Sequence, residues 1–357
     1  MRDLVFATIT TVLSFLIYVY PLNVLAHLLF AAEIIEPVTI FPTVAIGFAV
    51  FVYFRTHLTS RLLSGVIYYG MGIGFIAFWV LNIGLLISVL LPGFSIEIGL
   101  IGLVISMIVC VKAILSGNSI ALKTIHLTSP KIERKYNLVF ISDIHLGSNP
   151  KRHLERICDQ IHRLNYDHLL VGGDLFDSSA FDDDDLNLLK ALETPIFFVT
   201  GNHEYYVKNH NERIANLTKF GFTILDNQST QFDELNIIGI SDNQAPKTQS
   251  DIARTLISDD SFNLLIVHQP SLWHRAPEKT DLMLSGHTHN GQIFPFNLLV
   301  WMQFRTVYGM YRRLNSHLYV SSGSGTWGPR MRLGTQNEVV QISISPQIKD
   351  HQTMPGQ

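Results

Sequence analysis

The chain has 357 residues, with 26 Lys and Arg, 29 Asp and Glu, and a formal net charge of −3. Only 15% of its residues are charged, against about 25% in an ordinary soluble domain, and 47% are hydrophobic. Residues 1–117 hold only four of the cations and four of the anions, which excludes one evenly mixed globular domain, a disordered chain and a collagen-like repeat. No strongly basic tract predicts nucleic-acid binding. The two cysteines exclude a disulfide framework and a Cys-based zinc site.

Four runs within residues 1–117 are almost free of charge. They fit spanning helices at about 4–28, 37–54, 64–91 and 96–116, because a helix needs about 20 apolar residues to cross a bilayer. The first run is too long for the apolar core of a cleaved signal peptide, which has about 7–15 residues. A buried soluble bundle would need polar outer faces, which these runs lack. We therefore predict an all-α membrane region with four transmembrane helices over residues 1–117.

The positions of the cations predict the orientation of this region. The loop between the second and third runs and both ends of the region are cationic, whereas the other two loops carry only acidic residues. The cations are Arg2, Arg55, Arg61, Lys112, Lys123, Lys131, Arg134 and Lys135. Because cytoplasmic loops are enriched in Lys and Arg, we expect an integral, multi-pass protein of the cell membrane with a cytoplasmic C-terminal domain. Pro21 could split the first run, and an odd number of spans would place that domain outside.

From Asn137 onward, short apolar strands alternate with amphipathic helices. Residues 118–136 resemble a short polar linker, 137–345 a separate domain and 346–357 a tail. Strands are expected at 137–142, 167–172, 196–200, 235–240, 262–267 and 281–285, with late strands near 317–321 and 338–344, and helices at 151–164, 183–192, 208–220 and 248–258. Such alternation predicts an α/β layered fold. Functional groups in these folds collect at the carboxyl ends of the strands.

Polar side chains stand directly after five of these strands. They are Asp143 and His145, then Asp174, then Asn202 and His203, then His268, and finally His287 and His289. Oxygen donors mixed with imidazoles, without a thiolate, suit Mn, Fe or Zn better than Ca. Eight donors exceed the needs of one ion and fit two divalent ions that share a carboxylate.

Each block alone is weak evidence for a metal site. Gly173-Asp174 could be an ordinary turn, and His268 could be a satisfied core histidine. Gly286-His287-Thr288-His289 is stronger, because imidazoles at i and i+2 after a strand are unusual without a ligand. The order of the five blocks, each after a strand, favours a functional site over a structural one.

In this order, the blocks D-x-H, G-D, G-N-H-E, H and G-H-x-H resemble the calcineurin-like metallophosphoesterase superfamily over about residues 137–345. Residues 318–344 resemble its membrane-associated bacterial branch. The resemblance implies an αββα sandwich with a bimetal centre. It also implies that one ion is held by Asp143, His145 and His289, and the other by Asn202, His268 and His287. Asp174 would bridge the two ions. His203 would be catalytic and would be oriented by Asp177.

The predicted function is therefore that of an enzyme, a membrane-anchored metal-dependent phosphohydrolase. It would hydrolyse a phosphate ester or pyrophosphate through a metal-bound hydroxide, with the charge neutralised by two ions of Mn, Fe or Zn. One alternative is a tethered phosphodiesterase that acts on a soluble nucleotide-type substrate. Another is a non-enzymatic membrane scaffold, which would have no need for all eight donors.

The apolar residues 293–304 bear on the substrate. They follow His289 directly, and Arg305, Arg312 and Arg313 come after them. Such a segment can dip into a leaflet and form an entrance for a lipid-linked substrate, or it can pack inside the sandwich with solvated arginines nearby. The expected partners are the lipid bilayer and a phosphorylated small-molecule or lipid substrate, without nucleic acid.

The orientation can be tested with a reporter that works only outside the cytoplasm. Alkaline phosphatase fused after Gln357 should be inactive in cells, because the cationic flanks keep that end inside. The same reporter placed after Gly93, between the third and fourth runs, should be active and serves as the matched control. An active reporter after Gln357 would reverse the predicted orientation.

Overall fold

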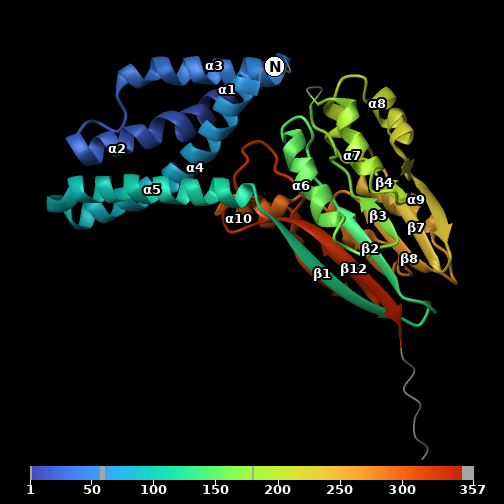
Figure 1. Cartoon of the computed structure of the whole chain (residues 1–357). Coiled ribbons are helices and arrows are strands. Elements are labelled where there is room, and N and C mark those ends of the chain that lie inside the picture. Colours follow the sequence, from blue (N-terminus) through green and yellow to red (C-terminus); the bar gives the residue numbers. More distant parts are fainter. Residues whose placement is uncertain (1, 57–60, 179–180, 348–357) are drawn as a thin grey trace, which may run out of the picture. The chain divides into compact units, whose positions relative to one another are not determined.

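The computed structural model describes residues 2–56, 61–178 and 181–347 (Figure 1). The chain forms two compact units. The first comprises Met1–Asn118 with Gly328–Leu333, and the second comprises Ser119–Trp327 with Gly334–Gln357. Almost all of the predicted tail, 346–357, lies outside the described residues, and the boundaries expected near 117 and 345 stay predictions.

The first unit contains four helical segments that are long and apolar enough to cross a membrane: Asp3–Phe30, Pro37–Thr56, Leu62–Leu90 and Pro92–Gly117. Their principal helices are α1 (Arg2–Ser14), α2 (Tyr20–Phe30), α3 (Ile40–Thr56), α4 (Arg61–Leu90) and α5 (Ser95–Gly117). Pro21 does not break the first segment. It lies in the first turn of α2, directly after a π-helical turn at Phe15–Val19, where a missing N–H is tolerated.

The segment Gly328–Leu333 packs on the helices of the first unit. Arg332 N donates a 2.8 Å hydrogen bond to Ala113 O in α5. A Cβ added at Gly117 would lie 2.5 Å from Arg330 O, so glycine permits this close approach of the two backbones. The helical unit thus includes six residues that come late in the sequence.

The second unit is built on two six-stranded sheets (Figure 1). The first sheet has the order β1 (Ile120–Ser129), β12 (Asn337–Pro346), β2 (Tyr136–Ile141), β3 (His168–Val171), β4 (Ile196–Phe198) and β5 (Phe222–Ile224). The second has the order β10 (Gly309–Arg313), β11 (Ser316–Val320), β9 (Leu282–Ser285), β8 (Phe262–Val267), β7 (Leu235–Ile240) and β6 (Gln228–Phe232).

Three apolar clusters define four layers. The central cluster joins the sheets through residues such as Phe140 and Leu264. The second lies between the first sheet and the helices α6 (Lys151–Ile161) and α7 (Asn187–Lys190). The third lies between the second sheet and α9 (Pro246–Leu256). This arrangement is the predicted αββα sandwich. The helix expected at 208–220 comprises α8 (His210–Asn216) and a 3₁₀ turn, Leu217–Phe220.

The prediction of a linker at 118–136 is wrong, because most of this segment is β1. This strand pairs in parallel with β12 from Ile120 opposite Asn337 to Ser129 opposite Pro346. Ile125 and Ser129 are buried and Leu127 is half-buried, whereas Thr124, His126 and Thr128 are exposed. The inward positions thus alternate with exposed polar side chains, a pattern of a strand with one buried face. The polar members of that pattern make the segment resemble a linker in composition.

The parallel pairing of the strands determines where the loops with the five polar blocks lie. Strands β2, β3 and β4 are mutually parallel, and so are β7, β8 and β9. Their near-continuous apolar sequences suit strands that are buried on both faces. The carboxyl ends of each parallel set therefore share one edge of their sheet, as the sequence predicts.

Candidate metal centre

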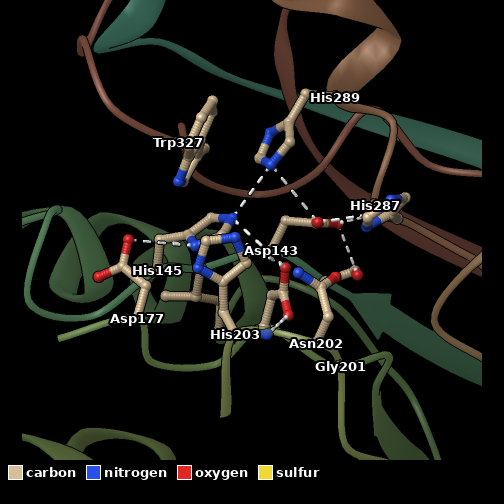
Figure 2. A network of polar contacts seen from close by, with 12 residues as sticks. Asp143, His145, Asp177, Gly201, Asn202, His203, His287, His289 and Trp327 are labelled. Carbon is tan, nitrogen blue, oxygen red and sulfur yellow. Dashed lines mark hydrogen bonds and ion pairs between the residues drawn. The ribbon is translucent and has the colours of Figure 1, made fainter. Parts of the chain in front are cut away.

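The five polar blocks meet at one place in the second unit (Figure 2). They follow β2, β3, β4, β8 and β9, so both sheets contribute side chains. The residues brought together are Asp143, His145, Asp174, Asn202, His203, His268, His287 and His289.

Asp143, His145 and His289 form the first group of possible ligands. The Nε2 atoms of His145 and His289 lie 3.0 Å apart, and His289 Nε2 lies 3.5 Å from Asp143 Oδ1. All three residues are buried. This group has the composition that the family resemblance implies for one ion.

Asp174, His268 and His287 form the second group. His268 Nε2 lies 3.1 Å from Asp174 Oδ2 and 3.3 Å from His287 Nδ1. Asp174 Oδ2 also lies 3.8 Å from His145 Nε2, so this carboxylate reaches both groups. A further overlapping set contains His145, Asp174 and His203. Asp174 thus has the position that a carboxylate shared by two ions needs.

The donor atoms fit metal ions. Asn202 Oδ1 is a buried acceptor without a hydrogen-bond partner among the described residues, which is costly unless a ligand completes it. His268 Nδ1 lies 2.8 Å from the carbonyl oxygen of Gly172 and can donate its proton there, which leaves the Nε2 lone pair for a metal. Nitrogen and oxygen donors without a thiolate suit Mn, Fe or Zn.

The backbone of the ligand loops is strained. Asp143, His145, Asp174, His287 and His289 have φ values of 57°, 53°, 52°, 71° and 49°. Non-glycine residues rarely adopt this left-handed region, which costs on the order of 1–3 kcal/mol for each residue and clusters at functional sites. The fold therefore directs five donors inward against their local preference.

Burial and mutual electrostatics set the protonation of the centre. Burial lowers the pKa of His203 to about 4 and that of His287 to about 3, so both imidazoles are neutral at pH 7, as metal ligation requires of His287. Burial acts in the same direction on His268, but Asp174 and Asp143 outweigh it and raise the pKa of His268 well above its usual range. Against the effect of its own burial, Asp174 has a lowered pKa because His268 stabilises its charge, both electrostatically and by a hydrogen bond.

The predicted role of Asp177 is wrong. Its Oδ2 lies 3.2 Å from His145 Nδ1, so it orients a ligand of the first group and not His203. The backbone explains this placement, because Asp177 N donates to Leu146 O and Asp177 Oδ1 accepts from Ser148 N. These bonds tie the loop after β3 to the loop that carries His145.

Glu204 is a site residue that the sequence prediction missed. Its buried carboxylate accepts hydrogen bonds from the backbone N–H groups of Asp174, Leu175, Phe176 and Gly201, at 2.7–3.2 Å. Burial and the charge of Asp174 raise its pKa, and the donors at Gly201 and Phe176 oppose that rise. Glu204 stands next to His203 within the G-N-H-E block, and this adjacency was the available signal.

Three aromatic rings border the centre. The ring centroids of Tyr206 and Trp327 lie 5.1 and 6.1 Å from that of His203. Phe304 lies 5.2 Å from the ring of His287. Figure 2 shows the edge of Trp327 on the same side of the centre as His289. Trp327 belongs to no recognisable motif, so the sequence offered no signal for it.

Comparisons with known proteins agree with this geometry. The model of the calcineurin-like phosphoesterase family matches residues 136–291. An uncharacterized metallophosphoesterase of Aquifex aeolicus is 31% identical over 216 residues, which cover 57% of this chain and 82% of that protein. One of Helicobacter pylori is 32% identical over 234 residues, which cover 60% of this chain and 61% of that protein.

A third relative, from Danio rerio, is described as a transmembrane protein with a metallophosphoesterase domain. It is 30% identical over 236 residues, which cover 58% of this chain and 52% of that protein. This chain belongs to the calcineurin-like metallophosphoesterase family. It spans about three fifths of the length of the Helicobacter relative.

Replacing Glu204 tests its positioning role. Glu204→Gln puts an amide N–H against backbone donors, so it should lower the melting temperature. It should also weaken metal binding by about 10- to 100-fold, the usual effect of losing a residue that positions the metal ligands. Elemental analysis and thermal unfolding would measure both effects. The matched control is Glu338→Gln, because Glu338 is also a buried carboxylate that accepts from Tyr319, Ser321 and Ser322. It should lose stability but keep its metal. Full metal content in Glu204→Gln would contradict this role.

Proposed function

We propose that this chain is a membrane-anchored, metal-dependent phosphohydrolase that uses two divalent ions to hydrolyse a phosphate ester or pyrophosphate. The observation that carries the proposal is the position of Asp174, which belongs to the second ligand group, lies 3.8 Å from His145 of the first group and has His203 beside it. When bound, two such ions supply a strong nucleophile from water at neutral pH and neutralise charge on the phosphate.

His203 has the position of a catalytic residue. Its backbone N–H donates to Asp174 Oδ1 at 2.9 Å, which fixes the residue beside the shared carboxylate. Its side chain is partly exposed, so a substrate can reach it. The neutral imidazole can donate a hydrogen bond to a phosphate oxygen. A bound phosphate also raises the pKa of the imidazole, which favours proton delivery to the leaving oxygen.

Membrane anchoring is supported by the four long apolar helices and by the transmembrane relative from Danio rerio. Two features make a non-enzymatic scaffold a poor alternative. The buried, unpartnered oxygen of Asn202 and the strained ligand loops are costly, and a scaffold gains nothing from them. A metal-dependent enzyme, by contrast, needs both the free Asn202 oxygen and the fixed geometry of these loops.

Metal dependence is the first test of this proposal. Purified full-length protein should hydrolyse bis-p-nitrophenyl phosphate, lose that activity with a chelator and regain it with Mn²⁺, because the nucleophile depends on the ions. Parallel additions of Fe²⁺ and Zn²⁺ would rank the metals. Full activity in excess chelator, with no metal found by elemental analysis, would refute the proposed chemistry.

A second test separates metal binding from chemistry. Asp174→Asn removes the shared charge and should release both ions. His203→Ala should keep nearly all of the metal and lower kcat by about 10²- to 10⁴-fold, the usual range for acid–base catalysis. His162→Ala, an exposed histidine at the end of α6, is the matched control and should behave as wild type. If His203→Ala loses metal as fully as Asp174→Asn, then His203 is a ligand and not a catalytic residue.

A further inference from the structure

The helix α10 (Phe296–Phe304) presents apolar side chains to solvent and has no buried residue. Leu298, Leu299, Trp301 and Met302 are 56%, 58%, 51% and 64% exposed. The interpretation of residues 293–304 as a loop inside the sandwich is therefore wrong for the exposed residues of this helix, whereas Ile293 is buried and Val300 and Phe304 are half-buried. An exposed apolar cluster of this kind marks an interaction surface.

The charged residues that flank α10 in the sequence have one sign. The sequence from Leu282 to Asn337 contains no Asp or Glu. Arg305 is exposed, and its guanidinium lies over the Trp301 ring, 4.5 Å from the centroid. Arg312 is exposed as well. Arg313, by contrast, is half-buried and donates to the carbonyl oxygens of Trp273 and Ala276, so its guanidinium is already hydrogen-bonded within the protein.

The same helix is attached to the metal centre at both ends. It begins seven residues after His289, and its last residue, Phe304, lies against the ring of His287. Thr288, between the two histidines, donates a 2.6 Å hydrogen bond to Val307 O, just beyond the helix. A molecule that lies along α10 therefore ends beside His287.

We propose that α10 docks on the lipid bilayer and that the substrate is an amphiphile whose phosphate group reaches the metal centre from the membrane. This proposal rests on the phosphohydrolase function given above. Three observations favour a bilayer over a protein partner as the occupant. The chain carries four helices suited to a membrane, the exposed helix is apolar, and its charged neighbours are cations beside a tryptophan, which suit anionic headgroups and the interface.

Docking can be measured on the full chain in vesicles. Met302→Cys can be labelled selectively with an environment-sensitive fluorophore, because both native cysteines are buried. In vesicles of phosphatidylglycerol and phosphatidylcholine, the probe should shift to the blue and be quenched by lipids that carry bromine on their acyl chains. Thr255→Cys, on the exposed side of α9, is the control and should show neither effect. A blue-shifted probe that bromolipids do not quench would mean that protein covers α10, and it would overturn the proposal.

Substrate class can be measured with two esters that share one reacting group. p-Nitrophenyl ethyl phosphate is soluble, and p-nitrophenyl hexadecyl phosphate inserts into vesicles. The variant Leu298→Gln/Leu299→Gln/Met302→Gln keeps good helix formers. It should lower kcat/KM for the hexadecyl ester at least tenfold and change that for the ethyl ester less than twofold. The control Thr248→Gln/Asp251→Gln/Thr255→Gln on α9 should change neither.

The outcomes separate the two proposals. Wild-type protein that hydrolyses neither ester would refute phosphodiester hydrolysis, the activity on which this test of docking rests. Equal losses on both esters, or unfolding of the α10 variant, would give α10 a structural role and refute docking alone. Arg305→Gln/Arg312→Gln provides a milder variant, which should remove the preference for anionic over zwitterionic vesicles and the sensitivity to salt. A preference that persists in this variant would also refute docking.

Discussion

The hydrogen bonds between the Glu204 carboxylate and four backbone N–H groups hold the loop that carries Asp174. They fix the loop after β3 to the loop after β4, so Asp174, Asn202 and His203 are positioned together. Four hydrogen bonds converge on this one buried carboxyl group, and a buried donor left without its partner is costly. The same contact therefore stabilises the fold and aligns the centre.

The sandwich makes that alignment possible. Parallel strands from both sheets end on one side, and the loops that follow turn sharply enough to place five of the possible metal ligands at positive φ. Close packing supports these turns. For example, a Cβ at Gly201 or Gly286 would collide with the carboxylates of Asp174 or Asp143. The strain in the loops is tolerated because three apolar clusters hold the strands that carry them.

The sequence predicts which polar side chains come together, because their positions after the strands are a local feature. A carboxylate or imidazole directly after an apolar strand is visible in the chain, and parallel strands bring such positions together. The partners behind the donors are harder to assign. Asp177 has one oxygen near His145 because of a backbone contact between Leu146 and Asp177, and Arg313 caps two carbonyl groups near Trp273. Both depend on tertiary contacts that no short motif records. The strand β1 was hidden because polar side chains occupy its exposed face.

The six residues Gly328–Leu333 have a consequence for how this protein can be divided. They belong to the helical unit, and they follow Trp327, whose ring lies near the imidazole of His203. The backbone therefore passes between the two units at three points: after Asn118, after Trp327 and after Leu333. A chain that starts at Ser119 would leave Gly328–Leu333 without the helix that accepts the hydrogen bond from Arg332. The helical region is therefore part of the folded protein and not only a membrane anchor. Any loss or exchange of its helices would have to keep the helix surface on which Gly328–Leu333 packs.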